Sequence, residues 1–335
     1  MEMQKFAQRL IGWFRENKRE MPWRESKDPY KIWISEVMLQ QTQVKTVIPY
    51  FNNFIQAYPT VTKLANASQQ SVLKAWEGLG YYSRARNLHK AAKIIATELN
   101  GRFPSEIKSL KSLTGVGDYT AAAIGSIAFG KAEAVVDGNV MRVLSRVCFI
   151  EEPVNQASSK KIFQQKADEL IDPHHPGEYN ESIMELGALV CTPGEPKCGE
   201  CPVSELCKAF KHNKTDEYPK RLKKEKTPTY NIAIGVVFKG DKLLITKRKQ
   251  DGLLGGLWEF PGGKIEKAES AEEACVREMK EETNLRVTVN RHLSTVKHAY
   301  SHFKIVMEVF ICDFISGDVV LSSPVDYRWI AIQEI

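Results

Sequence analysis

Hydrophobic and polar positions follow a helical period through the first two thirds of the chain and a strand period beyond it. Up to about residue 210, apolar side chains recur three and four positions apart, as at Phe6, Leu10 and Phe14. After about residue 229, the runs NIAIGVVF and LLITKR flank the turn KGDK, which is typical of a β-hairpin. A single helical segment, SAEEACVREMKEETNL, follows this hairpin. The pattern predicts a multidomain α and α/β protein, with an all-helical domain first.

One predicted helix carries a carboxylate among apolar neighbours. Asp28 and Pro29 are favourable as N-cap and first-turn residues, and they predict a helix that continues over residues 30–44. Trp33 and Val44 would face the core of that helix. Glu36 stands among Trp, Ile, Val, Met and Leu, which is unusual for a charged side chain, although an exposed glutamate on an amphipathic helix remains an alternative.

A later turn combines aromatic and basic residues. Gly78 and Gly80 interrupt a helix directly before Tyr81, and Arg84 and Arg86 follow. Aromatic rings beside arginines can stack on bases and contact phosphates. The same combination is also common where two helices join, so this turn alone does not decide between the two interpretations.

A glycine hairpin lies between two further helical segments, in the run LTGVGDYTAAAI. Gly115, Val116 and Gly117 allow the backbone to turn and to expose N–H groups before the second helix, which suits a phosphate. The run is a helix-hairpin-helix pattern and predicts contact with the DNA backbone. Asp137 follows about twenty residues later in VVDGN, where an aspartate before glycine is ordinarily a turn former or an N-cap.

Four of the seven cysteines crowd into seventeen residues with the spacing C-x6-C-x2-C-x5-C. They are Cys191, Cys198, Cys201 and Cys207. This spacing favours a 4Fe-4S cluster over a zinc ribbon, which usually has two C-x2-C pairs with a longer insert. Lys197 lies inside the first cysteine loop and could meet a phosphate. The other three cysteines are scattered and are interpreted as ordinary buried thiols.

Composition adds little to this picture. The chain has 335 residues, of which 43% are hydrophobic, and a net charge of +6 that only weakly favours a polyanionic partner. It contains no apolar segment of about 18 residues, so we expect a cytosolic protein without a membrane span. Residues 215–229 are basic, contain proline and lack periodicity, which predicts a connector between domains at 1–214 and 230–335.

These motifs together resemble one enzyme family. MPWR, SEVMLQQTQV, LGYYSRARNL, LTGVGDYTA, VVDGNVMRV and the cysteine cluster are similar, in this order, to the endonuclease III-like helix-hairpin-helix DNA glycosylases of the MutY type. The C-terminal domain resembles the Nudix (MutT-like) module that these glycosylases carry. The resemblance implies a bacterial-type, nucleoid-associated monomer that binds duplex DNA, contains a 4Fe-4S cluster and acts in base excision repair.

The resemblance also implies a reaction. Such an enzyme extrudes adenine mispaired with 8-oxoguanine or guanine and hydrolyses its glycosidic bond. Glu36 matches the family's general acid, and its apolar neighbours would raise its pKa. Asp137 matches the acid that stabilises the sugar cation. Tyr119 stands where strand-cleaving relatives carry a lysine, so we expect a predominantly monofunctional glycosylase.

Further residues are matched to DNA contacts by the same resemblance. The residues expected around the extruded adenine are Arg24, Leu39, Gln41, Tyr119 and Glu181. Gln41 and Tyr81 are expected to wedge into the duplex, and Asn139, the hairpin and Lys197 to contact DNA. The run HAYSHF matches the loop that reads 8-oxoguanine, with Tyr300, Ser301 and His302 as its contact residues.

Two alternative functions stay open at this point. One is a pyrimidine-lesion glycosylase with lyase activity, which Tyr119 disfavours. The other is nucleotide hydrolysis in the second domain, where Gly263, Glu269, Arg277, Glu278, Glu281 and Glu282 reproduce nearly the whole Nudix box. Only Asn284 replaces its last glycine, and asparagine tolerates positive φ well. We interpret the box as inherited scaffold rather than as a working hydrolase.

Overall fold

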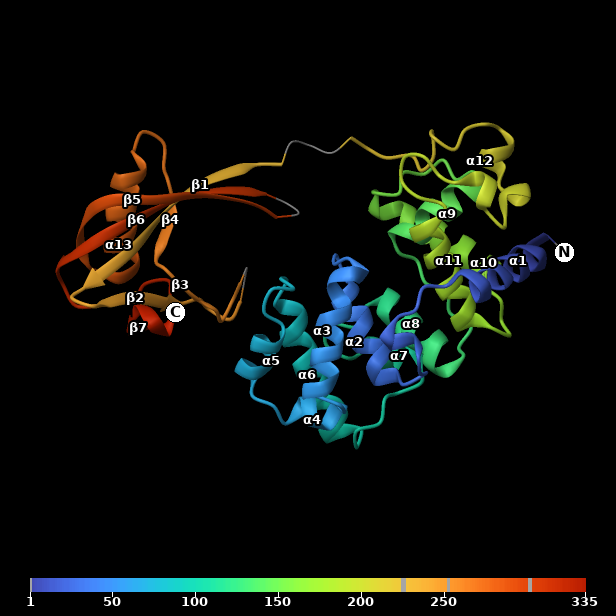
Figure 1. The fold of residues 1–335 in the computed structure, drawn as a ribbon, viewed down its shortest axis with the longest axis horizontal. Helices are drawn as coiled ribbons and strands as arrows, with labels where there is room; N and C mark the ends of the chain where they lie inside the picture. Colours follow the sequence, from blue (N-terminus) through green and yellow to red (C-terminus); the bar gives the residue numbers. More distant parts are fainter. Residues whose placement is uncertain (1, 224–226, 252–253, 301–302) are drawn as a thin grey trace. The chain divides into compact units, whose positions relative to one another are not determined.

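The chain forms two compact units, Met1–Lys223 and Lys224–Ile335, in the computed structural model (Figure 1). The structure describes residues 2–223, 227–251, 254–300 and 303–335. No helix within these ranges is both long and apolar enough to cross a membrane.

The first unit is helical, as the periodicity predicts. A short 3-10 turn, η1 (Pro22–Arg24), precedes the second helix. The α-helices of this unit are α1 (Glu2–Asn17), α2 (Pro29–Leu39), α3 (Val44–Ala57), α4 (Val61–Ala65), α5 (Gln69–Ala75), α6 (Ser83–Glu98), α7 (Ile107–Lys111), α8 (Asp118–Phe129), α9 (Gly138–Cys148), α10 (Lys160–Leu170), α11 (Pro176–Leu189) and α12 (Lys208–Lys211).

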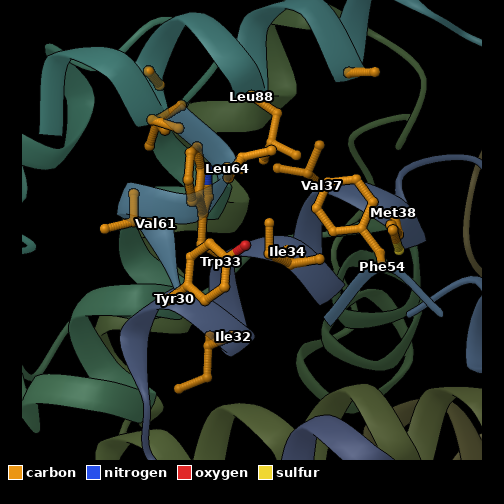
Figure 2. Close-up of a cluster of buried hydrophobic side chains, with 14 of the residues drawn as sticks. Tyr30, Ile32, Trp33, Ile34, Val37, Met38, Phe54, Val61, Leu64 and Leu88 are labelled. Carbon is orange, nitrogen blue, oxygen red and sulfur yellow. The ribbon is translucent and has the colours of Figure 1, made fainter. Parts of the chain in front are cut away.

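Two hydrophobic cores hold this unit together. The first lies among α2 to α8, where Trp33, Phe54 and Leu88 are buried (Figure 2). The second lies among α1 and α9 to α11, where Phe163 and Tyr179 are buried. Helix α8 contributes small alanines to both cores, so it can pack closely against neighbours on either side.

Helix α2 begins as the sequence predicts but ends early. The Asp28 side chain accepts a hydrogen bond from the Tyr30 N–H, and Pro29 occupies the first turn. The expected continuation to residue 44 is wrong, because Gln41 adopts a positive φ of 56°. Val44 instead starts α3. The break places the end of α2 at the surface, next to the cavity described below.

Helix α11 packs unusually close to the start of α9. A Cβ at Gly187 would lie 2.7 Å from Cβ of Asn139, so only glycine permits this approach. Asn180, fully buried on the same helix, accepts from the Val135 N–H and donates to Ser126 Oγ. These contacts fix the segment that leads into Asp137 against α8 and α11.

The second unit is a mixed sheet with one helix. Helix α13 (Ala271–Thr283) begins with a capping box at Ser270 and Glu273, and it packs on β1 and β5. Asn284 ends the helix with a φ of 60°, as expected for the residue that replaces the last glycine of the box. The strands are β1 (Thr229–Lys239), β2 (Lys242–Lys247), β3 (Trp258–Glu259), β4 (Gly262–Lys264), β5 (Arg286–Ala299), β6 (Lys304–Ser316) and β7 (Asp326–Ala331).

The sheet has the order β3-β2-β1-β6-β5, with β4 paired to β1 and β7 paired to β2. Strands β1 and β2 form the predicted antiparallel hairpin, whereas β1 and β6 are parallel. Cys275 and Cys312, expected to be scattered, both lie in this core with their sulfurs 3.7 Å apart. They are nonetheless buried thiols, as the sequence indicated.

Candidate active site

A cavity of about 930 Å³ lies within the helical unit, where its two cores meet. Helices α2, α8, α9 and α11 each contribute side chains to its wall. All five residues predicted around the adenine line this one cavity, and the two predicted acids and Asn139 line it as well: Arg24, Leu39, Gln41, Tyr119, Glu181, Glu36, Asp137 and Asn139.

Glu36 is a buried carboxyl at the inner wall of the cavity, with only 6% of its surface exposed. Burial is the largest of the effects that together raise its pKa to about 7; the nearby Asp137 and Glu181 contribute to the rise, whereas the Tyr119 hydrogen bond and Arg24 oppose it. A carboxyl in this state still holds a proton near neutral pH, which is the requirement for a general acid.

Tyr119, at the start of α8, donates a hydrogen bond from its hydroxyl to Glu36 Oε2 at 2.7 Å. Its oxygen also lies 3.2 Å from the Met184 sulfur. Burial, followed by the charges of Glu36 and Asp137, raises the Tyr119 pKa well above its usual value, so the phenol stays a donor. Tyr119 therefore fixes one oxygen of Glu36 and leaves Oε1 for another partner.

Asp137 is the N-cap of α9, as its place before glycine suggested, and it also lines the cavity. Its Oδ1 accepts from the Val140 N–H at 2.7 Å, and its Oδ2 accepts from the Asn139 amide at 3.0 Å. Burial raises the pKa of Asp137, while these hydrogen bonds act against the rise. Two donors hold the carboxylate in one orientation toward the cavity.

An ion-pair network in the cavity wall was only partly predicted. Arg24 donates to Glu181 at 2.8 Å, as its place near the adenine suggested, and also to Glu185 at 3.1 Å. Arg19 pairs with Glu185 at 2.8 Å. Burial alone would raise the Glu185 pKa, yet the bonds from Arg19 and Arg24 bring it to about 2. Glu185 therefore stays ionised and fixes the side chains of Arg19 and Arg24.

Glu185 and Arg19 escaped the sequence interpretation. Glu181 and Glu185, four positions apart on α11, were the available signal, because residues at this spacing share one face. Arg142 was also missed. It lies buried on α9 and donates to the Cys191 carbonyl at 2.7 Å and to Asn139 Oδ1 at 2.8 Å.

The glycine hairpin adopts a turn, but not every backbone N–H group in it is available to a phosphate. Gly115 has a φ of 81°, and a Cβ there would lie 2.7 Å from the Asn87 side chain. Val116 is buried and donates its N–H to the Leu113 carbonyl, so this N–H is already bonded within the turn. Gly117 is the N-cap of α8 and has no positive φ. The contact of the hairpin with a DNA phosphate therefore stays a prediction, and the N-terminus of α8 is its part suited to an anion.

The remaining predicted contacts lie outside the cavity wall. Tyr81 is 43% exposed on the turn before α6. Lys197 is exposed in the cysteine loop and lies 3.8 Å from Glu200. Tyr300 donates its backbone N–H to the Phe303 carbonyl at the end of β5, whereas Ser301 and His302 fall outside the described residues.

The four clustered cysteines line one small apolar cavity between α9, α11 and the loop that follows α11. Arg146 is buried beside them and donates to Cys191 Sγ at 3.3 Å. Burial raises the pKa of Cys201 to about 12, so a metal centre is needed to hold it as a thiolate. No group of three His, Cys, Asp or Glu side chains within the described ranges converges on a single metal ion. Four thiols around a shared cavity fit a polynuclear cluster, which would hold residues 191–207 together.

Comparisons with known proteins cover nearly all of the chain. Residues 34–173 match the HhH-GPD superfamily base excision DNA repair protein, residues 191–207 the iron-sulfur binding domain of endonuclease III, and residues 233–335 the NUDIX domain. The chain is 35% identical to the adenine DNA glycosylase of Homo sapiens, over 99% of this chain and 71% of that protein. It is 36% identical to that of Rattus norvegicus, over 91% and 70%.

The chain belongs to the adenine DNA glycosylase family. The fold class, the iron-sulfur binding domain and the Nudix module predicted from the motifs are thereby confirmed. A solved structure titled as a thermostable thymine-DNA glycosylase is 29% identical, with a TM-score of 0.58, over 63% of this chain and 97% of that one. A trapped endonuclease III–DNA intermediate, 22% identical with a TM-score of 0.53, supports the fold of the helical unit.

In this adenine DNA glycosylase the Nudix-box side chains are bonded mainly to one another. Arg277 donates to Glu269 at 2.7 Å, to Glu278 at 2.9 Å and to Glu281 at 3.1 Å. Burial raises the pKa of Glu282 to about 7, and its carboxyl accepts from the Gly262 N–H. These bonds connect the middle and the end of α13 with Glu269 before the helix and with β4, which is consistent with a scaffold role.

Proposed function

We propose that this enzyme extrudes adenine mispaired with 8-oxoguanine or guanine from duplex DNA and hydrolyses its glycosidic bond. The observation that carries the proposal is the pairing of Glu36 and Asp137 across one cavity. Two carboxyl groups on opposite sides of a scissile glycosidic bond, one protonated and one ionised, provide the usual chemistry for breaking it.

Glu36 acts as the general acid in this mechanism. Tyr119 donates to Oε2, which directs the acidic proton to Oε1, the oxygen that has no bond to Tyr119. Proton transfer from Oε1 to a ring nitrogen makes adenine a better leaving group, and the pair of electrons of the C–N bond departs with the base. The Glu36 carboxylate that results can then orient or deprotonate the attacking water.

Asp137 stabilises the positive charge that develops on the sugar as the bond breaks. Because the Asn139 amide and the Val140 N–H hold its carboxylate, little reorganisation is needed when that charge appears. Arg24 and Glu181 line the same cavity and offer a donor and an acceptor to the adenine edge. Tyr119 supplies no amine for a Schiff base, which supports a glycosylase with little lyase activity.

Two exposed side chains are assigned to contacts with the DNA duplex. Gln41 lies at the cavity wall and Tyr81 on the neighbouring turn, and both would enter the gap that the extruded nucleotide leaves. Tyr300, Ser301 and His302 would read the 8-oxoguanine on the other strand. Borohydride trapping of a covalent DNA complex would instead favour the pyrimidine-lesion lyase.

The substrate is tested by single-turnover release of adenine from matched duplexes. We expect fast release from A:8-oxoguanine, slower release from A:G and none above background from A:T. Duplexes of identical flanking sequence control for general DNA affinity. Equal release from A:T and A:8-oxoguanine would contradict the proposal.

The pKa values of Glu36 and Asp137 should determine how the rate of adenine release depends on pH. Glu36 has a pKa of about 7, so the protonated acid is lost as the pH rises through 7, and the rate should then fall about tenfold per pH unit. Asp137 has a raised pKa and must be ionised, so the rate should fall again toward acid. Single-turnover rates between about pH 5 and 9 test this bell-shaped profile. A rate that stays constant above pH 7 would contradict the role of Glu36.

A further inference from the structure

Arg84, near the start of α6, is a buried arginine whose guanidinium bonds to two separate turns of backbone. At the end of α2, its Nη1 donates to the carbonyl groups of Val37 and Met38, each at 2.9 Å, and to that of Gln40 at 2.6 Å. Its Nη2 donates to the carbonyl group of Gly80 at 3.3 Å, on the turn that precedes α6. Only 8% of Arg84 is exposed, so the phosphate contact considered for it from the sequence is wrong.

Each of the two turns carries a residue with strained backbone. Gln41 follows Gln40 and has a φ of 56°, and Tyr81 follows Gly80 and has a φ of 49°. Residues other than glycine rarely adopt this conformation, and they keep it only where the surrounding structure holds them. The Arg84 guanidinium also lies 5.4 Å from the centre of the Tyr81 ring.

The arrangement uses properties that arginine alone has. Its planar fork of five N–H groups can reach several acceptors at once, whereas a lysine is a compact charge on a flexible stem. Burial lowers the Arg84 pKa to about 10, so the group remains charged at neutral pH. The negative end of the α2 dipole, formed by the carbonyl groups that Arg84 contacts, offsets part of the cost of burying this cation.

We propose that Arg84 is a positioning residue that holds Gln41 and Tyr81 in one fixed relation, so that both enter the duplex together when adenine is extruded. A single guanidinium bonds to the residue immediately before each wedge residue, and therefore neither turn can shift without breaking its bonds. This inference rests on the proposed function, because it assigns Arg84 to the extrusion step rather than to bond cleavage.

The test compares Arg84→Lys and Arg84→Met with Lys90→Gln, a change at an exposed position of the same helix. Adenine release is measured from an A:8-oxoguanine duplex and from a duplex in which the adenine is bulged and already unpaired. We expect Arg84→Lys to slow release from the mispair about 100-fold, the typical cost of misplaced groups, and to change release from the bulge little. Lys90→Gln should match the unaltered enzyme on both substrates.

Two further readouts separate positioning from general damage. Hydrogen exchange without DNA should show lost protection in Arg84→Lys only around residues 40–42 and 79–82. In a background that carries both Gln41→Ala and Tyr81→Ala, adding Arg84→Lys should cause no further loss on the mispair, because the residues it positions are absent. The fluorescence of 2-aminopurine in the duplex follows its unstacking. In Arg84→Lys this unstacking should be slowed in the same proportion as adenine release.

Several outcomes would overturn the inference. Equal losses on the mispair and the bulge, a further loss in the background without the wedge residues, or unfolding of both Arg84 variants would each make Arg84 a general structural residue. If the unaltered enzyme releases no adenine from any duplex, the proposed function fails instead. Hydrogen exchange at the two turns then decides whether Arg84 couples them.

Discussion

Replacing Glu36 with glutamine is expected to slow adenine release by about 10²–10⁴-fold, the contribution typical of a positioned general acid. Glutamine has nearly the shape of the protonated carboxyl and keeps an oxygen that can accept the Tyr119 hydrogen bond. It has no acidic proton to give to the departing base. The change therefore removes the proton transfer while it preserves the packing of α2.

Single-turnover release from an A:8-oxoguanine duplex is the measurement for this variant, together with binding of the same duplex. Affinity should change little, because Glu36 is buried and its loss acts on the chemical step. Glu98→Gln, an exposed glutamate on α6, is the matched control and should release adenine normally. The upper limb of the pH profile should also disappear in Glu36→Gln. Normal release by this variant would exclude Glu36 as the acid.

The stability of the variant gives a second, independent check. Because the folded-state pKa of Glu36 is raised from 4.5 to about 7, the unfolded chain ionises this carboxyl first, so the stability of the fold falls as the pH rises from about 4.5 to 7 and the loss is complete above 7. Below the ordinary pKa the carboxyl is protonated in both states and contributes no such penalty. Glu36→Gln is therefore expected to unfold at a higher temperature than the unaltered protein above pH 7, and at a similar temperature in acid.

How much of the site could be predicted from the sequence depends on how local its determinants are. Asp28 and Pro29 predict the start of α2, and the apolar run around Glu36 predicts that this side chain is buried. Both predictions succeed because the residues that decide them lie within one helix. The end of α2 at Leu39 was missed because the positive φ of Gln41 has no local signal, and the carbonyl groups there bond to Arg84, which lies more than forty positions away.

The same reasoning explains which side chains were overlooked in the cavity. Glu185 and Arg19 meet only because α1 and α11 pack together, and the charge of Glu185 depends on two arginines from outside its own helix. The local sequence pattern shows that α11 carries Glu185, but it does not show which arginine bonds to this glutamate. Conversely, the cysteine spacing was decisive because the four ligands lie within one short loop.

Asp137 has two roles that one substitution can separate. Replacing it with asparagine is expected to slow adenine release by about 10²–10³-fold, the usual cost of removing a preorganised charge from a reacting centre. Asparagine is as good an N-cap as aspartate, so α9 should keep its start. Asp137→Asn should therefore lose less thermal stability than Asp137→Ala, which should lose about 1 kcal/mol with the cap.

The pH profile of Asp137→Asn distinguishes electrostatic stabilisation from a purely structural role. The charge of Asp137 is one of the causes that raise the Glu36 pKa, so its removal should move the upper limb of the residual activity toward acid. The lower limb, which reports ionisation of Asp137, should vanish. If Asp137 served only as the cap of α9, asparagine would leave the rate and both limbs unchanged, and the positive charge on the sugar would have to be stabilised by another group of the cavity.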